Sequence, residues 1–167
     1  VYNARWILER AVRDYPLRVD VNKLKEKSRF LYHSLQEIRD CSDAPKLLGL
    51  EGEAASVYFS VFDQLILQQK EDFSFGERSR RPPLNKVNAM LSFAYSLLAG
   101  MCGSALEVVG LDPYVGFYHT DRPGRMSLAL DVMEELRGVM ADRFVITMIN
   151  KRIIKKVLKP QDFKTFS

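Results

Sequence analysis

The chain has 167 residues, 47% of them apolar, which is enough for one domain with a real core and argues against disorder. Its formal net charge is +4, and its two cysteines fit neither a disulfide framework nor a zinc motif, so we expect reduced thiols in a cytosolic protein. No apolar run approaches the roughly 18 residues that a membrane-spanning helix needs, and we expect no membrane contact.

The N-terminal stretch, residues 2–13, is charged and amphipathic and predicts a helix, or alternatively a linker from a preceding part of the protein. The chain begins with Val1 and ends in "KPQDFKTFS", which looks like an element cut short. We therefore expect residues 1–167 to be one domain of a longer protein, with both of its ends missing.

Five further helices follow from apolar periodicity. The first spans Val21 to Ile38, with Asp20 as its N-cap and "DCSDAP" as its end. The second begins near Glu51, runs to about Leu67 and is apolar on nearly all sides. The third covers residues 84–109 and stops at Gly110.

The fourth of these helices covers residues 128–139 with Ser127 as its N-cap, and one more covers about residues 142–158. Loops are predicted over residues 70–83 and 111–125, where glycine and proline turn signals gather. No segment alternates with period two, so we expect no sheet. The predicted fold class is all-α, a single helical bundle domain.

Basic residues gather in two places. The segment "RSRRPPLNK" contains Arg78, Arg80, Arg81 and Lys86 without an acid, and "KRIIKKVLKPQDFK" has six basic residues against one aspartate. Such clusters can neutralise phosphates. A solvated loop and a solvated helix end are the alternative.

Acidic residues gather in "LALDVMEEL". Asp131 lies three residues before Glu134 and four before Glu135, so these side chains project side by side from one helix and repel each other unless a cation lies between them. This spacing is one reason to expect a metal site. The alternative is an acid favoured by the helix dipole at Asp131 and two glutamates that face water.

Two more residues complete a set of metal-binding side chains. Glu51 lies between two glycines at the predicted helix start, and His119 lies in the loop that leads into the acidic helix. A carboxylate, an imidazole and another acid suit Mg²⁺ or Mn²⁺, and the imidazole favours Mn²⁺. A first-turn acid and a loop histidine without a role are the alternatives. No protein nucleophile is visible, so any nucleophile comes from the substrate or from water.

Four segments together resemble the C-terminal helical domain of the CRISPR-associated adaptation integrase, a metal-dependent endonuclease that inserts new spacers: "LEGEAASVYF", "RSRRPPLNKVNAMLSFAYSLL", "ALEVVGLDPYVGFYHTDRPGRMSLALDVMEELR" and "DRFVITMINKR". The resemblance covers roughly residues 15–160 and is strongest to type I variants. It implies a Mn²⁺ or Mg²⁺ site formed by Glu51, His119 and either Asp131 or Glu134. We favour Glu134 as the direct ligand, with Asp131 as a close partner.

The resemblance also implies a reaction and partners. The 3′-hydroxyl of a spacer DNA fragment attacks a phosphodiester of the CRISPR repeat, in the cytoplasm of a prokaryote. Full-length members are homodimers held by an N-terminal β-domain, which this chain lacks, and they work with a small ferredoxin-like adaptation partner. We therefore expect this chain to bind metal but to integrate DNA poorly.

Further residues receive roles by position. The basic residues of "RSRRPPLNK" would hold phosphates of double-stranded DNA, and the loop with Arg122 and Arg125 lies beside the site. Asn88, Ser92 and Tyr95 form a polar line on an otherwise apolar helix, which either faces the site or is a buried hydrogen-bond seam. A hydrolytic metal-dependent nuclease and a non-catalytic helical scaffold that binds DNA or protein remain as alternative functions.

Overall fold

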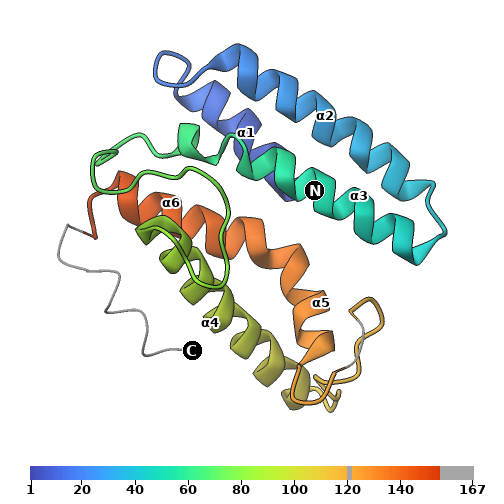
Figure 1. Cartoon of the computed structure of the whole chain (residues 1–167). Coiled ribbons are helices and arrows are strands. Elements are labelled where there is room, and N and C mark those ends of the chain that lie inside the picture. Colours follow the sequence, from blue (N-terminus) through green and yellow to red (C-terminus); the bar gives the residue numbers. More distant parts are fainter. Residues whose placement is uncertain (120–121, 155–167) are drawn as a thin grey trace.

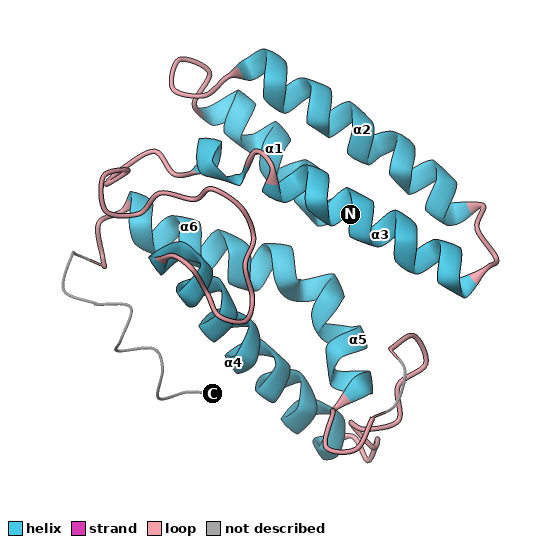
Figure 2. Cartoon of the chain, viewed as in Figure 1, coloured by secondary structure: helices cyan, strands magenta, loops and turns pink. Residues whose placement is uncertain are grey.

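The computed structural model describes residues 1–119 and 122–154. Every regular element in this described part is helical, which confirms the predicted all-α class (Figure 2). The elements in chain order are α1 (Tyr2–Asp14), α2 (Val21–Arg39), α3 (Ala44–Phe59), the 3₁₀ turn η1 (Phe62–Leu65), α4 (Lys86–Val108), α5 (Ser127–Leu136), the π-helical segment η2 (Arg137–Asp142) and α6 (Arg143–Asn150).

The helices form two groups that face each other (Figure 1). In the first group α2 packs against both α1 and α3, and in the second α4 packs against α5, η2 and α6. Contacts between α1 and η2 join the groups. The main core lies where they meet, and its fully buried side chains include Leu8, Leu24, Leu31, Phe62 and Leu91.

Helix α1 confirms the predicted opening helix and is part of the domain. Its residues Ile7, Leu8 and Ala11 are buried in the main core, against α2. A linker would not bury an apolar stripe in this way, so the alternative interpretation of residues 2–13 does not describe this structure.

Two predicted helix ends are confirmed. The Asp20 carboxylate accepts a hydrogen bond from the Lys23 amide (3.0 Å) and caps α2. Helix α4 begins at Lys86, two residues later than expected, because the Asn85 side chain caps it through the Asn88 amide (2.8 Å). Gly110 follows its end with a φ of 80°, a conformation that favours glycine.

The predicted start of α3 is wrong. The helix begins at Ala44, because the Asp43 carboxylate accepts from the Lys46 amide (3.1 Å) and Pro45 lies in the first turn. It ends at Phe59, before η1, and not at about Leu67. Glu51 therefore lies in the middle of the helix, so the helix dipole does not explain an acid at this position.

The last two predicted helices are one continuous run. Helix α5 begins at Ser127 with Met126 at the capping position, so the prediction of Ser127 as N-cap is wrong by one residue. The π-helical segment joins α5 directly to α6, which ends at Asn150 and not near residue 158. Residues 151–154 are not helical, and most of the basic stretch 151–164 lies outside the described residues.

A second, smaller core holds the far end of α4 against α5 through Leu98, Cys102, Leu106 and Met133. By length and composition alone α4 could cross a membrane, so the expectation that no segment is apolar enough was wrong. The core helix of a globular domain passes the same test, and α4 packs against α5, η2 and α6.

Candidate metal centre

A cavity of about 720 Å³ lies between the two helix groups. Helix α3 contributes Glu51 to one wall, and the opposite wall contains His119 from the loop before α5 and Asp131 and Glu134 from α5. Side chains from three separate parts of the sequence thus converge on one space. In the described part of the chain, however, no three acidic, histidine or cysteine side chains are close enough together to hold a metal as they stand.

Glu51 is held by a tyrosine. The Tyr118 hydroxyl donates to Oε2 of Glu51 over 3.1 Å. Burial and the negative charge of Glu51 raise the pKa of Tyr118 well above its usual value, so the hydroxyl keeps its proton.

His119 is oriented by Asp131. The ring nitrogen Nδ1 lies 2.6 Å from Oδ1 of Asp131, and because an ionised carboxylate only accepts, Nδ1 carries the proton. The second ring nitrogen, Nε2, is then the one with a lone pair. This carboxylate–imidazole arrangement is the usual support of a metal-binding histidine.

Asp131 also organises the loop. Its two oxygens accept from the backbone amides of Phe117 (3.0 Å), Tyr118 (3.1 Å) and His119 (3.0 Å). Burial alone would raise the pKa of Asp131, but the hydrogen bonds from the His119 ring and the three amides lower it below its ordinary value. Both oxygens of Asp131 are engaged and its side chain is only 1% exposed. Asp131 therefore holds the His119 ring and the loop backbone in position.

Glu134 is paired with an arginine. Nη1 of Arg137, three residues further along the chain, donates to Oε1 of Glu134 over 2.8 Å. Arg137 is the first residue of the π-helical segment, a rare form that often marks functional sites.

The donor set fits a divalent cation. Five carboxylates line the cavity (the other two are Glu135 and Asp142), and the arginines that face them are Arg80 and Arg137. An excess of carboxylates repels a polyanion such as DNA unless a cation is bound. Two glutamates and an imidazole suit Mn²⁺ or Mg²⁺, and each of them already has a protein partner that orients it.

Asn88, Ser92 and Tyr95 form the buried seam that was one of the two interpretations. Asn88 is fully buried, and its Oδ1 accepts from Nη1 of Arg78 (2.9 Å) and from the Ser79 amide (3.1 Å). Nη2 of Arg78 lies 3.3 Å from Oγ of Ser92. These contacts fix the loop before α4 to the helix.

Tyr95 extends this seam to the cavity wall. Its hydroxyl donates to Oδ1 of Asp142 over 2.5 Å, and its ring lies beside both Arg78 (5.4 Å) and Arg137 (5.6 Å). Burial raises the pKa of Asp142 against the opposing effects of Tyr95 and Arg137. The seam therefore contains both positive and negative groups, Arg78 and Asp142, and Tyr95 contacts both of them.

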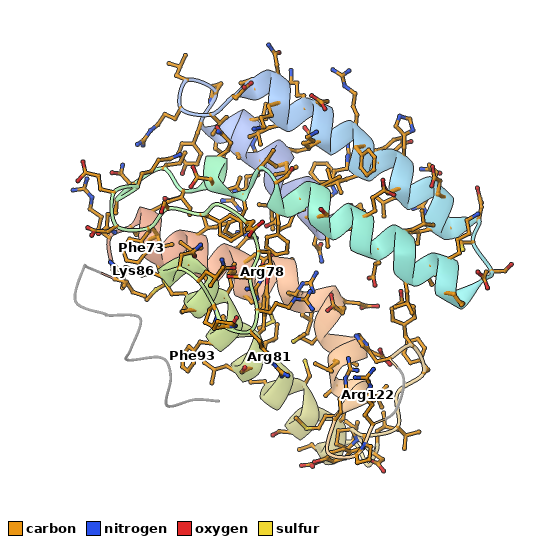
Figure 3. All side chains as sticks on the ribbon, viewed as in Figure 1. Phe73, Arg78, Arg81, Lys86, Phe93 and Arg122 are labelled. Carbon is orange, nitrogen blue, oxygen red and sulfur yellow. The ribbon has the colours of Figure 1, made fainter. Side chains whose placement is uncertain are left out.

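The predicted DNA-binding residues lie in different settings (Figure 3). Arg78 donates to Asn88 and Ser92 in the seam, and its role in DNA binding stays a prediction. Lys86 lies 3.7 Å from Asp72 and over the ring of Phe73. Arg80 lines the cavity and Arg81 is exposed.

The loop before α5 contributes the remaining predicted phosphate contacts. Arg122 is exposed and Arg125 is half-buried, and both lie between His119 and Asp131 in the chain. Neither lines the cavity. Their role in DNA binding stays a prediction.

Three residues of the cavity, Tyr118, Arg137 and Asp142, were not among those predicted from the sequence. Arg137 had a signal, because a basic residue three positions after Glu134 on a helix is placed to pair with it. Tyr118 adjoins His119, but nothing in a loop sequence shows where a hydroxyl will point. Asp142 is the last residue of the π-helical segment, and that segment shifts the register that α-helical periodicity assumes.

The family model for the CRISPR-associated protein Cas1 matches residues 1–165. The chain is 49% identical over 149 residues to a CRISPR-associated endonuclease Cas1 of Chlorobaculum tepidum, covering 89% of this chain and 43% of that protein. It is 50% identical over 159 residues to another from Rhodospirillum rubrum, covering 93% and 46%. The chain thus spans about half the length of these curated relatives.

Solved structures agree. A casposase bound to an integration product superposes with a TM-score of 0.74 at 29% identity, covering 92% of this chain and 41% of that one. A Cas1 protein from Thermotoga maritima gives 0.70 at 31%, covering 92% and 48%. The resemblance seen in the sequence is confirmed, and the chain belongs to the Cas1 family of CRISPR-associated proteins.

Proposed function

We propose that this chain is the metal-dependent catalytic domain of a CRISPR adaptation endonuclease and integrase, which joins 3′-hydroxyl ends of spacer DNA to the CRISPR repeat by transesterification. The observation that carries the proposal is the single cavity into which Glu51, His119 and Glu134 converge from three elements. The curated relatives are named CRISPR-associated endonucleases, which supports the same activity.

Glu51, Glu134 and Nε2 of His119 would hold Mn²⁺ or Mg²⁺. A divalent cation there supplies electrophilic stabilisation of a scissile phosphate and of the charge that develops on it. Asp131 keeps the proton on Nδ1 of His119, so that Nε2 keeps its lone pair. Tyr118 and Arg137 hold the two glutamates in place.

The protein needs no nucleophile of its own in this reaction. A DNA hydroxyl attacks the phosphodiester, the new phosphodiester bond forms as the old one breaks, and the proton of the attacking hydroxyl ends on the leaving 3′ oxygen. The protein's own contribution is to position the two DNA strands. Arg80 at the cavity and the exposed Arg81 are placed to contact phosphates near it.

The partners we propose are double-stranded DNA, both as spacer fragment and as repeat, a second copy of the full-length protein, and a small ferredoxin-like adaptation protein, in the cytoplasm of a prokaryote. A casposase bound to its integration product and Cas1 within a Cas6-RT-Cas1–Cas2 complex are structural neighbours that support DNA and Cas2-type partners. The latter superposes with a TM-score of 0.78 at 27% identity, covering 92% of this chain and 16% of that one.

An integration assay tests the proposal. The full-length protein, with its adaptation partner, Mn²⁺, a spacer-like duplex and a repeat-containing plasmid, should give branched DNA products, and Glu51→Gln should abolish them. Glu53→Gln, an exposed position on the same helix, is the matched control. Linear products alone would indicate a hydrolytic nuclease, and no products with intact DNA binding would indicate a scaffold. The 167-residue chain alone should bind Mn²⁺ but integrate poorly, because strand transfer needs both DNA ends held in place.

A further inference from the structure

Tyr118 links the two walls of the cavity. Its amide is held by Asp131 of α5 (3.1 Å), and its hydroxyl reaches Glu51 of α3 (3.1 Å) on the opposite wall. Its ring also lies edge-on to the ring of His119, with centroids 5.8 Å apart. One side chain thus contacts two of the three predicted metal ligands.

Glu51 depends on this contact for its orientation. Its neighbours one turn away on α3, which also line the cavity, are leucines and alanines without a side-chain donor: Leu47, Leu48, Ala54 and Ala55. The two glycines that flank it, Gly49 and Gly52, have open space around them. Helix α3 therefore provides no side-chain donor one turn away from the Glu51 carboxylate. The Tyr118 hydroxyl provides a donor from the opposite wall.

From this geometry we propose that Tyr118 is a positioning residue of the metal centre, which holds Oε2 of Glu51 so that Oε1 faces the cation. This inference rests on the proposed metal site. A hydroxyl is a neutral donor, so it can keep its bond to Glu51 when a cation binds. Arg137 beside Glu134 differs, because its positive charge opposes the cation. The two glutamates are thus held in place by partners with opposite effects on metal affinity.

Tyr118→Phe in the 167-residue chain tests the inference, with Mn²⁺ binding followed by calorimetry. The substitution removes only the hydroxyl, and supporting groups of this kind typically contribute 10–100-fold to metal affinity, so we expect Mn²⁺ binding to weaken by about tenfold. Tyr114→Phe is the matched control, because Tyr114 lies in the same loop, is exposed and does not line the cavity. Its Mn²⁺ affinity should equal that of the wild type.

The outcomes separate this inference from the proposed function. Mn²⁺ bound equally well by Tyr118→Phe and by the wild type would overturn the role of Tyr118 and leave the metal site intact. A wild-type chain that binds no Mn²⁺ would overturn both. A Tyr118→Phe chain without helical circular dichroism would show a residue needed for folding, which also contradicts a hydroxyl that acts only on Glu51.

Discussion

Two polar clusters in this helical domain are built in opposite ways. In the seam, Arg78 donates to Asn88, Tyr95 donates to Asp142, and the Tyr95 ring lies beside Arg78. At the cavity, Tyr118, Asp131 and Arg137 hold Glu51, His119 and Glu134 respectively, and these three side chains line open space. A polar cluster whose groups bond mainly to one another and to the neighbouring chain stabilises the fold, whereas one held from a single side has capacity left for a ligand.

The seam should have the larger effect on stability. Asn88→Ala removes three side-chain hydrogen bonds at a fully buried site, to Arg78, Ser79 and Glu77, so we expect a loss of about 3–5 kcal/mol, or roughly 10 °C in melting temperature. Ser104→Ala, exposed on the same helix, should change little. Thermal unfolding measures both, and a small change for Asn88→Ala would show that the seam is not what fixes the loop to α4.

The cavity should affect ligand binding and not stability. Saturation at about 100 times the dissociation constant stabilises a protein by roughly 2.7 kcal/mol, so Mn²⁺ should raise the melting temperature of the wild type. Glu51→Gln should abolish this rise and leave the metal-free melting temperature unchanged, while Glu53→Gln keeps the rise. If Mn²⁺ stabilises Glu51→Gln as much as the wild type, Glu51 is not a ligand.

Arg137 lies between the two clusters, paired with Glu134 and beside the Tyr95 ring. Its charge opposes a cation bound at Glu134, and two unit charges about 4 Å apart interact by about 1 kcal/mol even at the dielectric constant of water. Arg137→Gln should therefore bind Mn²⁺ roughly fivefold more tightly in calorimetry, whereas Arg143→Gln, exposed on α6, should not. Weaker binding by Arg137→Gln would mean that its hold on Glu134 outweighs its charge.

The smallest effect is expected for the exposed arginines. Alanine at Arg80 and Arg81 should weaken DNA binding alike for all sequences and reduce the slope of log K against log salt by about 0.9 for each lost phosphate contact. Alanine at Lys23 and Lys25, which are exposed on α2, is the control, because it changes the net charge by the same amount. An unchanged slope would make this loop ordinary solvated surface. Arg78→Ala, by contrast, should lower the melting temperature, because Arg78 donates to Asn88 and Ser92 in the seam.

Sequence patterns predicted the helices with strong caps, such as α2 behind Asp20 and α4 before Gly110. They misplaced the start of α3, because the "DCSDAP" segment that ends one helix also contains Asp43, the cap of the next. The break expected between α5 and α6 is absent, because a π-helical segment continues the chain through Gly138.

The site was predictable in part. The spacing of Asp131 and Glu134 and the position of His119 indicated one cluster, and the structure brings Glu51 to it from α3. Spacing could not assign the roles of Asp131 and Glu134, because these depend on which oxygens the loop amides and Arg137 occupy. Tyr118 depends on a contact across the cavity between elements far apart in the sequence, and no local pattern carries that information.

The proposed function depends most directly on one cation bound in the cavity. Crystals soaked in Mn²⁺ and measured at wavelengths on either side of the manganese absorption edge would locate it. We predict one anomalous peak within bonding distance of Glu51, His119 and Glu134, with Asp131 still bonded to Nδ1 of His119. The absence of a peak in the cavity, or a peak bound by other residues, would contradict the assignment of this site.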